Sequence, residues 1–458
     1  MAGARGNENG AGNGSGGEGG GGGGAAAGRR WTAYRPLIAL GVALAALGGF
    51  GTTFLANSGH LPFFSMVTAW QTPYDSAPSG GGAGVWLVDD TVVRSRFDGM
   101  TGYDVRSGAK RWEHAVPGRT EVCAVDTDTT TAVTLLAHRA AGPVKERGNG
   151  KGCGTVVAVD LADGRELWRT AGERTGGGAV VGVGHGLGVF LDSREASRDT
   201  SRDTVRDASR VARHDGGRLR AVDLRTGAAR WTAALPKGCA LGDLGLSAQR
   251  LVAAMDCADG AVLTAFGPAD GEVRWTVPLD TRRGADRGAG LSVVSADPPT
   301  VRAGGEAVLS FSPDGRPRGS IPVVGDRGRI VRTAVDHGRL LTITSYRNGP
   351  GGARERLVAF DLASGDELWR RDVGDGPGNV EALDVTDGRV TTVRTDWEHG
   401  DTLYVHDAAT GDEKDDRTFR DQVADYGNPL RALLTHGDLL IVVRGYDGAR
   451  PFSVYDRW

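Results

Sequence analysis

Cysteine, methionine and net charge are all scarce in this sequence. Only four of its 458 residues are Cys and four are Met, and 54 Lys and Arg against 57 Asp and Glu leave a formal net charge of −3. Four cysteines are too few for a disulfide-rich scaffold. The near balance of charge removes any bulk attraction to nucleic acid, so we predict no nucleic-acid partner.

The motifs of common enzyme classes are also missing. The sequence has no G-x-S-x-G elbow, no Walker loop and no H-E-x-x-H pair. The run VVGVGHGLGVFL does not fit G-x-G-x-x-G and is flanked by strands on both sides, so we interpret it as a hairpin that turns at Gly184 to Gly186. We therefore assign no catalytic residue.

One group of His and Asp is dense enough to consider as a metal site. It consists of Asp396, His399, Asp401, His406 and Asp407. Two interpretations stay open. These residues could meet on adjacent strands as ligands of a metal ion, or they could be charges in exposed loops. Exposed loop charges are the commoner arrangement, and we predict no metal site.

The N-terminal region divides into a polar tail and one long apolar run. Residues 1–35, which precede the apolar run, are rich in Gly and have few apolar side chains. This composition predicts a disordered cytoplasmic tail. Residues 36–56 carry no charge and are long enough to cross a bilayer as a transmembrane helix. Because Arg29, Arg30 and Arg35 precede this run, the positive-inside bias predicts that everything after it is extracytoplasmic.

A cleaved export signal is the alternative to this single-pass anchor. The pair Arg29-Arg30 is compatible with a twin-arginine signal. Cleavage after Ala56 would place the bulky Phe54 where a small residue is preferred, so we favour the anchor. Residues 57–66 are interpreted as a linker.

A repeated unit organises the rest of the chain. Its clearest copy, residues 156–168, reads VVAVDLADGRELW: an apolar strand, an Asp, a Gly four residues later and a Trp four residues after that. Four copies keep all three residues, at Asp104, Gly108 and Trp112, at Asp160, Gly164 and Trp168, at Asp223, Gly227 and Trp231, and at Asp361, Gly365 and Trp369. Degraded copies keep Gly271 and Trp275, shorten the turn at Gly315, or end at Asp415 where Trp is expected after Asp407 and Gly411.

Each copy is typical of a β-hairpin. The Asp accepts hydrogen bonds from the turn amides, the Gly supplies a positive φ, and the Trp lies on the return strand. Burial of one indole contributes about 4–6 kcal/mol of gross transfer free energy. We therefore expect each Trp to pack where one unit meets the next.

Counting the units predicts an all-β, eight-bladed propeller over residues 67–458. Two further strands precede most hairpins, and about fifty residues per unit is a usual propeller spacing. The segment 67–73, with Trp70, resembles a return strand without its partners, and we expect it to pair with the C-terminal strands and close the ring. A seven-bladed ring is the alternative, because Pro298-Pro299 interrupts the fifth unit. We interpret residues 193–215 as a solvated surface loop, with a partner-binding arm as the alternative.

The four cysteines occupy two equivalent positions in two units. Cys123 and Cys239 each open a first strand, and Cys153 and Cys257 each precede a third strand. We therefore predict the disulfides Cys123–Cys153 and Cys239–Cys257, which would persist outside the membrane. C-x-x-C and C-x-x-H spacings are missing, which argues against a metal site.

The unit AVDLADGRELW resembles the repeat of the quinoprotein-type, or PQQ-like, β-propellers. This resemblance implies an eight-bladed propeller, a fold shared by quinone-dependent alcohol dehydrogenases and by non-enzymatic scaffolds such as an outer-membrane assembly lipoprotein. The enzymatic members have adjacent cysteines over the quinone, and Glu, Asn and Asp around Ca²⁺. This chain has no Cys-Cys pair, and none of the family's catalytic residues can be placed on it.

We therefore expect a non-catalytic, membrane-tethered extracytoplasmic propeller that binds an envelope protein or a peptide. No cofactor is predicted, although PQQ and Ca²⁺ stay open. A quinone-dependent oxidoreductase on the same propeller is the alternative function.

Overall fold

The computed structural model describes most of the repeat region and no residue before Ser65. The described residues are 65–74, 84–118, 120–140, 155–171, 179–192, 217–279, 290–347, 353–374, 379–396, 400–421, 423, 429–445 and 450–456. The predicted tail 1–35, the run 36–56, the loop 193–215 and Cys153 therefore lie outside the described residues. Within them every regular element is a β-strand, and no helix there is long and apolar enough to cross a membrane.

Six sheets each contain four consecutive antiparallel strands, one of them with a short extra strand. The first three sheets are β2 (Gly84–Val88), β3 (Thr91–Arg96), β4 (Gly99–Asp104) and β5 (Lys110–Ala115); β6 (Thr120–Asp128), β7 (Val133–Ala140), β8 (Thr155–Asp160) and β9 (Glu166–Ala171); and β10 (Ala179–Gly184), β11 (Leu187–Asp192), β12 (Arg218–Asp223) and β13 (Ala229–Ala234). The next three are β14 (Cys239–Leu246), β15 (Leu251–Cys257), β16 (Gly260–Phe266) and β17 (Val273–Pro278); β18 (Leu291–Ala296), β19 (Pro299–Ala303), β20 (Ala307–Phe311) and β21 (Pro317–Pro322); and β22 (Val324–Gly325), β23 (Gly328–Asp336), β24 (Arg339–Arg347), β25 (Ala353–Asp361) and β26 (Glu367–Asp372).

The remaining strands form one sheet that joins the two ends of the repeat region. Its order is β27-β28-β29-β30-β1-β33-β32-β31. The bounds are β27 (Asn379–Thr386), β28 (Arg389–Thr395), β29 (Thr402–Asp407), β30 (Glu413–Phe419), β31 (Leu430–His436), β32 (Leu439–Arg444), β33 (Phe452–Asp456) and β1 (Ser65–Gln71). β1 begins two residues before the predicted boundary at residue 67, and it lies antiparallel to β33 with Thr68 opposite Tyr455.

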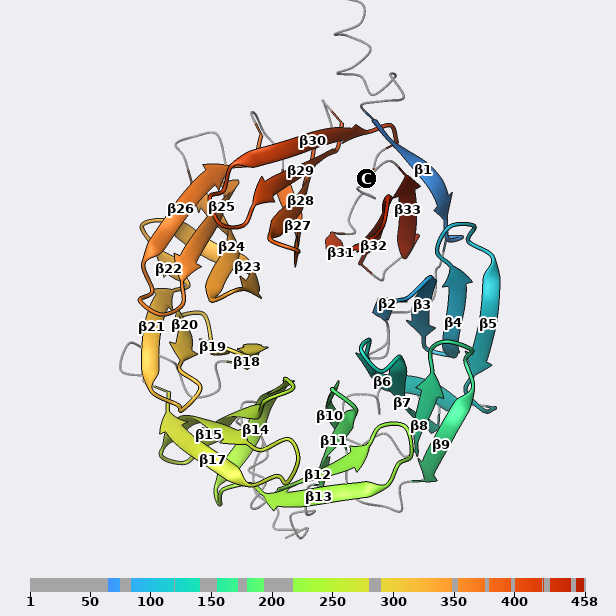
Figure 1. The fold of residues 1–458 in the computed structure, drawn as a ribbon, viewed down its shortest axis with the longest axis vertical. Coiled ribbons are helices and arrows are strands. Elements are labelled where there is room, and N and C mark those ends of the chain that lie inside the picture. The colour runs from blue at the N-terminus through green and yellow to red at the C-terminus, as the bar shows by residue number, and fades with distance from the viewer. Residues whose placement is uncertain are drawn as a thin grey trace, which may run out of the picture. The chain divides into compact units, whose positions relative to one another are not determined.

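The sheets are arranged around a common axis, as in a β-propeller (Figure 1). The first strand of each four-stranded sheet, such as β2, β6 or β10, lies nearest the axis, and its fourth strand lies on the outer rim. Middle strands such as β32 are buried along their whole length, whereas outer strands such as β5 alternate between buried and exposed residues. This is expected, because a middle strand is covered on both faces by neighbouring sheets and an outer strand keeps one edge in water.

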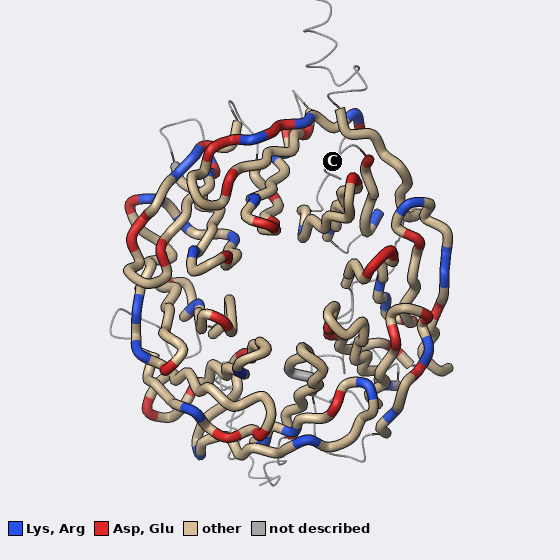
Figure 2. Tube along the Cα trace, viewed as in Figure 1, with Lys and Arg blue, Asp and Glu red and all other residues tan. Residues whose placement is uncertain are grey.

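The outer strands carry charges of both signs. Figure 2 shows Lys and Arg interspersed with Asp and Glu along the rim. β30 is the most charged, since five of its seven residues, EKDDR, are ionisable. Charged side chains on an exposed strand edge oppose pairing with another chain.

The fifth repeat forms a complete four-stranded sheet, β18 to β21. The peptide bond between Asp297 and Pro298 is cis, and Pro299 begins β19 directly after this turn. The two prolines therefore make the tight turn between the first and second strands of this sheet without interrupting it. The hairpin predicted at Gly184 to Gly186 is also present, with φ values of 49° at His185 and 77° at Gly186.

Cys239 and Cys257, which the repeat positions pair, form a disulfide. They lie directly opposite each other on β14 and β15, with their Cα atoms 3.9 Å apart. Cys123 is also disulfide-bonded, but its predicted partner Cys153 lies outside the described residues.

Removal of the Cys239–Cys257 bridge should destabilise the propeller. The bridge closes a loop of 18 residues, for which the chain-entropy model gives about 3 kcal/mol. We expect a protein with Cys239→Ser and Cys257→Ser to lose free energy of unfolding of that order in urea titrations. Reduction of the wild-type protein with dithiothreitol gives the matching comparison, and an unchanged urea midpoint in both experiments would contradict this estimate.

Candidate functional site at the blade junctions

The repeated tryptophans bind adjacent sheets together. Trp112 on β5 is 8% exposed, and its indole N–H donates to the carbonyl of Leu161 at 3.1 Å in the next sheet. Five other indoles make the same bond to the residue that follows the Asp position: Trp70 to Val105, Trp168 to Leu224, Trp231 to Pro268, Trp275 to Pro313 and Trp369 to Ala408. These bonds measure 2.8–3.2 Å.

A turn glycine lies directly against each of these indoles. Gly164 has a φ of 76°, and a Cβ atom on it would lie 2.5 Å from Cε3 of Trp112. The same close approach occurs for Gly108 and Trp70, Gly227 and Trp168, Gly271 and Trp231, Gly315 and Trp275, and Gly411 and Trp369. Glycine is therefore required at this position both for its backbone conformation and for the space that the indole occupies.

The repeated Asp is a turn acceptor. Asp223 accepts hydrogen bonds from the amides of Arg225 and Thr226, and from the Arg230 guanidinium at 2.5 Å. The bond from Arg230, together with those from Thr226, lowers the pKa of Asp223 to about 2. Asp104 is held below its usual pKa in the same way, chiefly by the amide and hydroxyl of Ser107. These carboxylates are thus fully ionised and bonded within their own turns.

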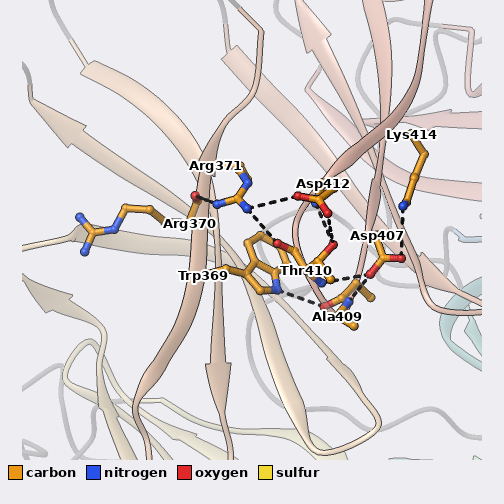
Figure 3. A network of polar contacts seen from close by, with 9 residues as sticks. Trp369, Arg370, Arg371, Asp407, Ala409, Thr410, Asp412 and Lys414 are labelled. Carbon is orange, nitrogen blue, oxygen red and sulfur yellow. Dashed lines mark hydrogen bonds and ion pairs between the residues drawn. The ribbon is translucent and has the colours of Figure 1, made fainter.

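Figure 3 shows one complete junction, at Trp369. The indole lies against the turn that begins at Asp407, and Arg371 beside it donates to the Thr410 carbonyl at 3.0 Å. Asp407 accepts from the amides of Ala409 and Thr410, and Lys414 lies 3.8 Å from its other oxygen. The turn is therefore fixed by side chains of two sheets.

The junction between β21 and the following sheet has no indole. Gly319 takes its place, and its amide donates at 3.1 Å to Leu362, the carbonyl that an indole would otherwise contact. The Ser310 hydroxyl also donates to Leu362. Gly365 therefore packs against the backbone of Ser320, because the preceding sheet supplies no indole at this position.

Arg327 lies in the turn between β22 and β23 and contacts β25 and β26 of the same sheet. Its guanidinium lies 5.5 Å from the Phe360 ring centroid and donates to Glu367. Arg370 donates to the same carboxylate at 2.6 Å, and the two cations outweigh burial and lower the pKa of Glu367. A cavity of about 390 Å³ is present here, lined by Pro322, Arg327 and Phe360 among others.

No indole of the described residues lies at the junction after β30, and here a cavity of about 510 Å³ is present. Asp415 stands at the Trp position. The cavity is lined by Gly437 of the β31–β32 turn and by six charged residues, which are Asp387, Arg389, Asp407, Lys414, Asp415 and Arg417. Because it is open and polar, this cavity is the candidate binding site.

Acidic residues near the axis form a second set of contacts between sheets. Asp126 accepts from the amide of Val183 at 2.8 Å, and Asp243 accepts from that of Val293 at 2.7 Å. Glu355 and Glu381 accept in the same way from the amides of Val380 and Leu430. Burial raises the pKa of Asp126 and of Glu355. These residues were not predicted from the sequence. Asp126, Asp243 and Glu381 lie on the first strands β6, β14 and β27, whereas Glu355 lies on β25.

The Asp and His group considered as a metal site is not gathered at one point. Asp401 and Asp407 lie at opposite ends of β29, and His399 lies outside the described residues. Asp396, Asp401 and His406 are 7%, 3% and 1% exposed, so the expectation of exposed loop charges is wrong for these three. Asp401 is buried because it accepts from the amides of Asp396 and Val423. Among the described residues no group of His, Cys, Asp and Glu could hold a metal ion.

Buried His406 should make the stability depend on pH. Desolvation, aided by Arg371, lowers its pKa to about 4. Between pH 6.5 and 4 the unfolded chain therefore binds a proton that the folded chain excludes, and stability falls as the pH falls. The shift corresponds to about 3 kcal/mol.

The His406→Leu variant tests this contribution. The free energy of unfolding is measured by urea titration from pH 7 to 4 for the wild type and the variant. We expect the decrease over this pH range to be about 3 kcal/mol smaller in the variant than in the wild type. Parallel pH profiles for wild type and His406→Leu would contradict the assignment.

Comparison with known proteins identifies the family. A family model described as outer membrane protein assembly factor BamB matches residues 152–414 and 308–443, which together span more than half of the chain. The chain belongs to this family. It is a PQQ-like repeat propeller, as the resemblance of its repeat implies. No curated protein matches the sequence.

Two solved structures are similar to this chain. BamB from Moraxella catarrhalis is 13% identical with a TM-score of 0.49, and the match covers 84% of this chain and 99% of that one. The quinohemoprotein alcohol dehydrogenase ADHIIG from Pseudomonas putida HK5 is 11% identical with a TM-score of 0.50, and the match covers 86% of this chain and 76% of that one. Identities this low show the fold alone.

The residues near the axis do not fit a quinone and its Ca²⁺ ion. The carboxylates of Asp126, Asp243 and Glu381 are bonded to backbone amides of the next sheet, which occupies oxygens that a cation would need. Cys239 and Cys257 pair across two strands of one sheet and are not adjacent in sequence. We therefore derive no chemistry through that cofactor.

Proposed function

We propose that this chain is a membrane-tethered, extracytoplasmic β-propeller that acts as a non-catalytic binding or scaffold module in the cell envelope. The observation that carries this proposal is the use of the repeated residues. Every full unit shares an Asp, a Gly and a Trp. The Asp accepts hydrogen bonds within its own turn, as Asp223 does from Thr226, and the indole N–H donates to the next sheet, where a turn glycine lies against the ring, as for Trp112 and Gly164. They hold the ring together and leave no recurring group for chemistry.

The proposed ring has eight blades. Among the described residues, β27 to β30 and β31 to β33 with β1 are paired as strands through two residue pairs alone, Ser65 with Thr418 and Met66 with Phe419. We therefore count the eight-stranded sheet as two blades, added to the six others. An electron-microscopy projection along the axis would count the blades directly, and seven would overturn this part of the proposal.

A cofactor-loading assay separates the proposal from the oxidoreductase alternative. Residues 57–458 are purified and incubated with PQQ and Ca²⁺, and the protein is examined for a bound chromophore and for dye reduction with primary alcohols. We expect neither signal. A stoichiometric chromophore with dye reduction would overturn the non-catalytic function.

The proposed tether is tested by deletion of residues 36–56. The full chain should sediment with membranes, and its repeat region should be digested when protease is added to cells with a permeabilised outer layer. The deletion variant should lose membrane association, and an unrelated transmembrane helix in the same place should restore it. Protection of residues 57–458 from external protease would contradict the proposed orientation.

A further inference from the structure

One buried histidine in the second sheet has no partner for either ring nitrogen. His138 on β7 is 5% exposed, and neither its Nδ1 nor its Nε2 has a hydrogen-bond partner within the described structure. Its neighbours on the adjacent strands are Val122 and Thr155. A protonated imidazole would leave two unpaired donors and a buried charge at this position, which costs more than the neutral ring. His138 can therefore take up a proton only when the packing around it opens to water.

His138 faces the junction between the first and second sheets. Leu136, two residues earlier on β7, packs with Trp112 of β5 in the core of this junction, and side chains two residues apart lie on one face of a strand. His114 follows Trp112 by the same interval on β5, so it faces the second sheet. The two histidines influence each other electrostatically across the junction, and burial lowers the pKa of both.

Protonation of both histidines would give this junction more cations than carboxylates. The other charged groups that act on His114 and His138 are Glu166 and Arg169 of β9. Glu166 already accepts from Arg169 through both of its oxygens, at 3.1 and 2.6 Å. Uptake of two protons would therefore set three positive charges against one occupied carboxylate. Repulsion between like charges then acts in the same direction as the cost of desolvation, and both favour separation of the two sheets.

We propose that His114 and His138 form an acid-sensitive switch that opens the junction between the first and second sheets. The pKa of each histidine is lowered in the closed junction, so protons are taken up on opening. The free energy that keeps the junction closed is therefore fully present above the ordinary pKa of 6.5 and decreases as the pH falls below it. Opening exposes Trp112 and the turn of Gly164, which pack against each other here. This inference goes beyond the proposed function and does not depend on it.

Hydrogen-exchange mass spectrometry on the full chain in detergent tests the switch. Segments 110–116 and 160–168 report on the two sides of this junction. Segments 229–235 and 265–271, which contain no histidine, report on the junction between the third and fourth sheets. Protection is compared at pH 7.5 and 5.0 after correction for intrinsic exchange rates. In the wild type we expect the first two segments to lose protection at least about fivefold more than the other two.

Two charge variants give the deciding comparison. Glu166→Gln and Arg169→Gln break the same ion pair, but the first removes a carboxylate and the second removes a cation. We expect Glu166→Gln to raise the pH at which protection is lost and Arg169→Gln to lower it. His138→Leu, which removes the unpartnered ring, should abolish the additional loss at the first junction. A shift in the same direction for both charge variants, a full acid response in His138→Leu, or equal loss at both junctions of the wild type would overturn the proposal.

Discussion

Replacing Trp112 by alanine should lower the free energy of unfolding of the propeller by about 3–5 kcal/mol. The indole is 8% exposed, it donates to Leu161, and it lies against Gly164 of the next sheet. The substitution removes apolar contact, leaves a cavity between two sheets and deprives a buried carbonyl of its donor, and all three effects act in the same direction. Equilibrium unfolding in guanidinium chloride, followed by tryptophan fluorescence and by circular dichroism, measures the loss.

Two controls separate the contributions to this loss. Trp112→Phe keeps most of the apolar area and removes the N–H donor, so it should cost about 1–3 kcal/mol. Leu368→Ala changes a side chain on the fourth strand of another blade that is 45% exposed, and it should cost under about 1 kcal/mol. If Trp112→Ala costs no more than Leu368→Ala, the indole does not hold the junction.

The repeat could be predicted from sequence because its residues act locally or recur at a fixed interval. The Asp of each turn bonds to amides two and three residues later, as Asp407 does with Ala409 and Thr410. Gly164 needs a positive φ whatever surrounds it. Such requirements recur with every unit, so the pattern shows the unit length and the all-β class.

The junctions could not be predicted in full, because their partners lie in different units. Trp369 shares a unit with Gly365 but covers Gly411, while Gly365 depends on the residue at the Trp position of the preceding unit. That residue is Gly319. The unit with Asp361, Gly365 and Trp369 therefore keeps all three repeat residues, but no indole lies against Gly365. The Gly of one unit contacts the preceding unit, and its Trp contacts the following unit, so one motif belongs to two different interfaces.

The axial carboxylates and the cavity were harder to predict for the same reason. Asp126 bonds to Val183, 57 residues away, and nothing adjacent to either residue marks the contact. The cavity after β30 is lined by Asp415, which stands at the Trp position of its unit. The sequence showed the replacement, but the space it leaves depends on how the first and last strands meet.

Gly164→Ala should destabilise the same junction by about 2–5 kcal/mol, and the comparison with Gly388→Ala isolates the reason. Both glycines have positive φ, 76° and 71°, so both substitutions incur the left-handed backbone cost of about 1–2 kcal/mol. A Cβ atom on Gly388 meets nothing within 4 Å, whereas one on Gly164 lies 2.5 Å from the Trp112 ring. The additional loss at Gly164, about 1–3 kcal/mol, is the cost of displacing the indole.

A double-mutant cycle makes this attribution specific. Once Trp112→Ala has removed the ring, the alanine at Gly164 has space, and its cost should fall to that of Gly388→Ala. The coupling free energy between the two substitutions should therefore be about 1–3 kcal/mol and favourable, while Gly388→Ala and Trp112→Ala should be additive. Additivity of Gly164→Ala with Trp112→Ala would show that the glycine is needed for its backbone conformation alone, and that the indole does not set the spacing of the blades.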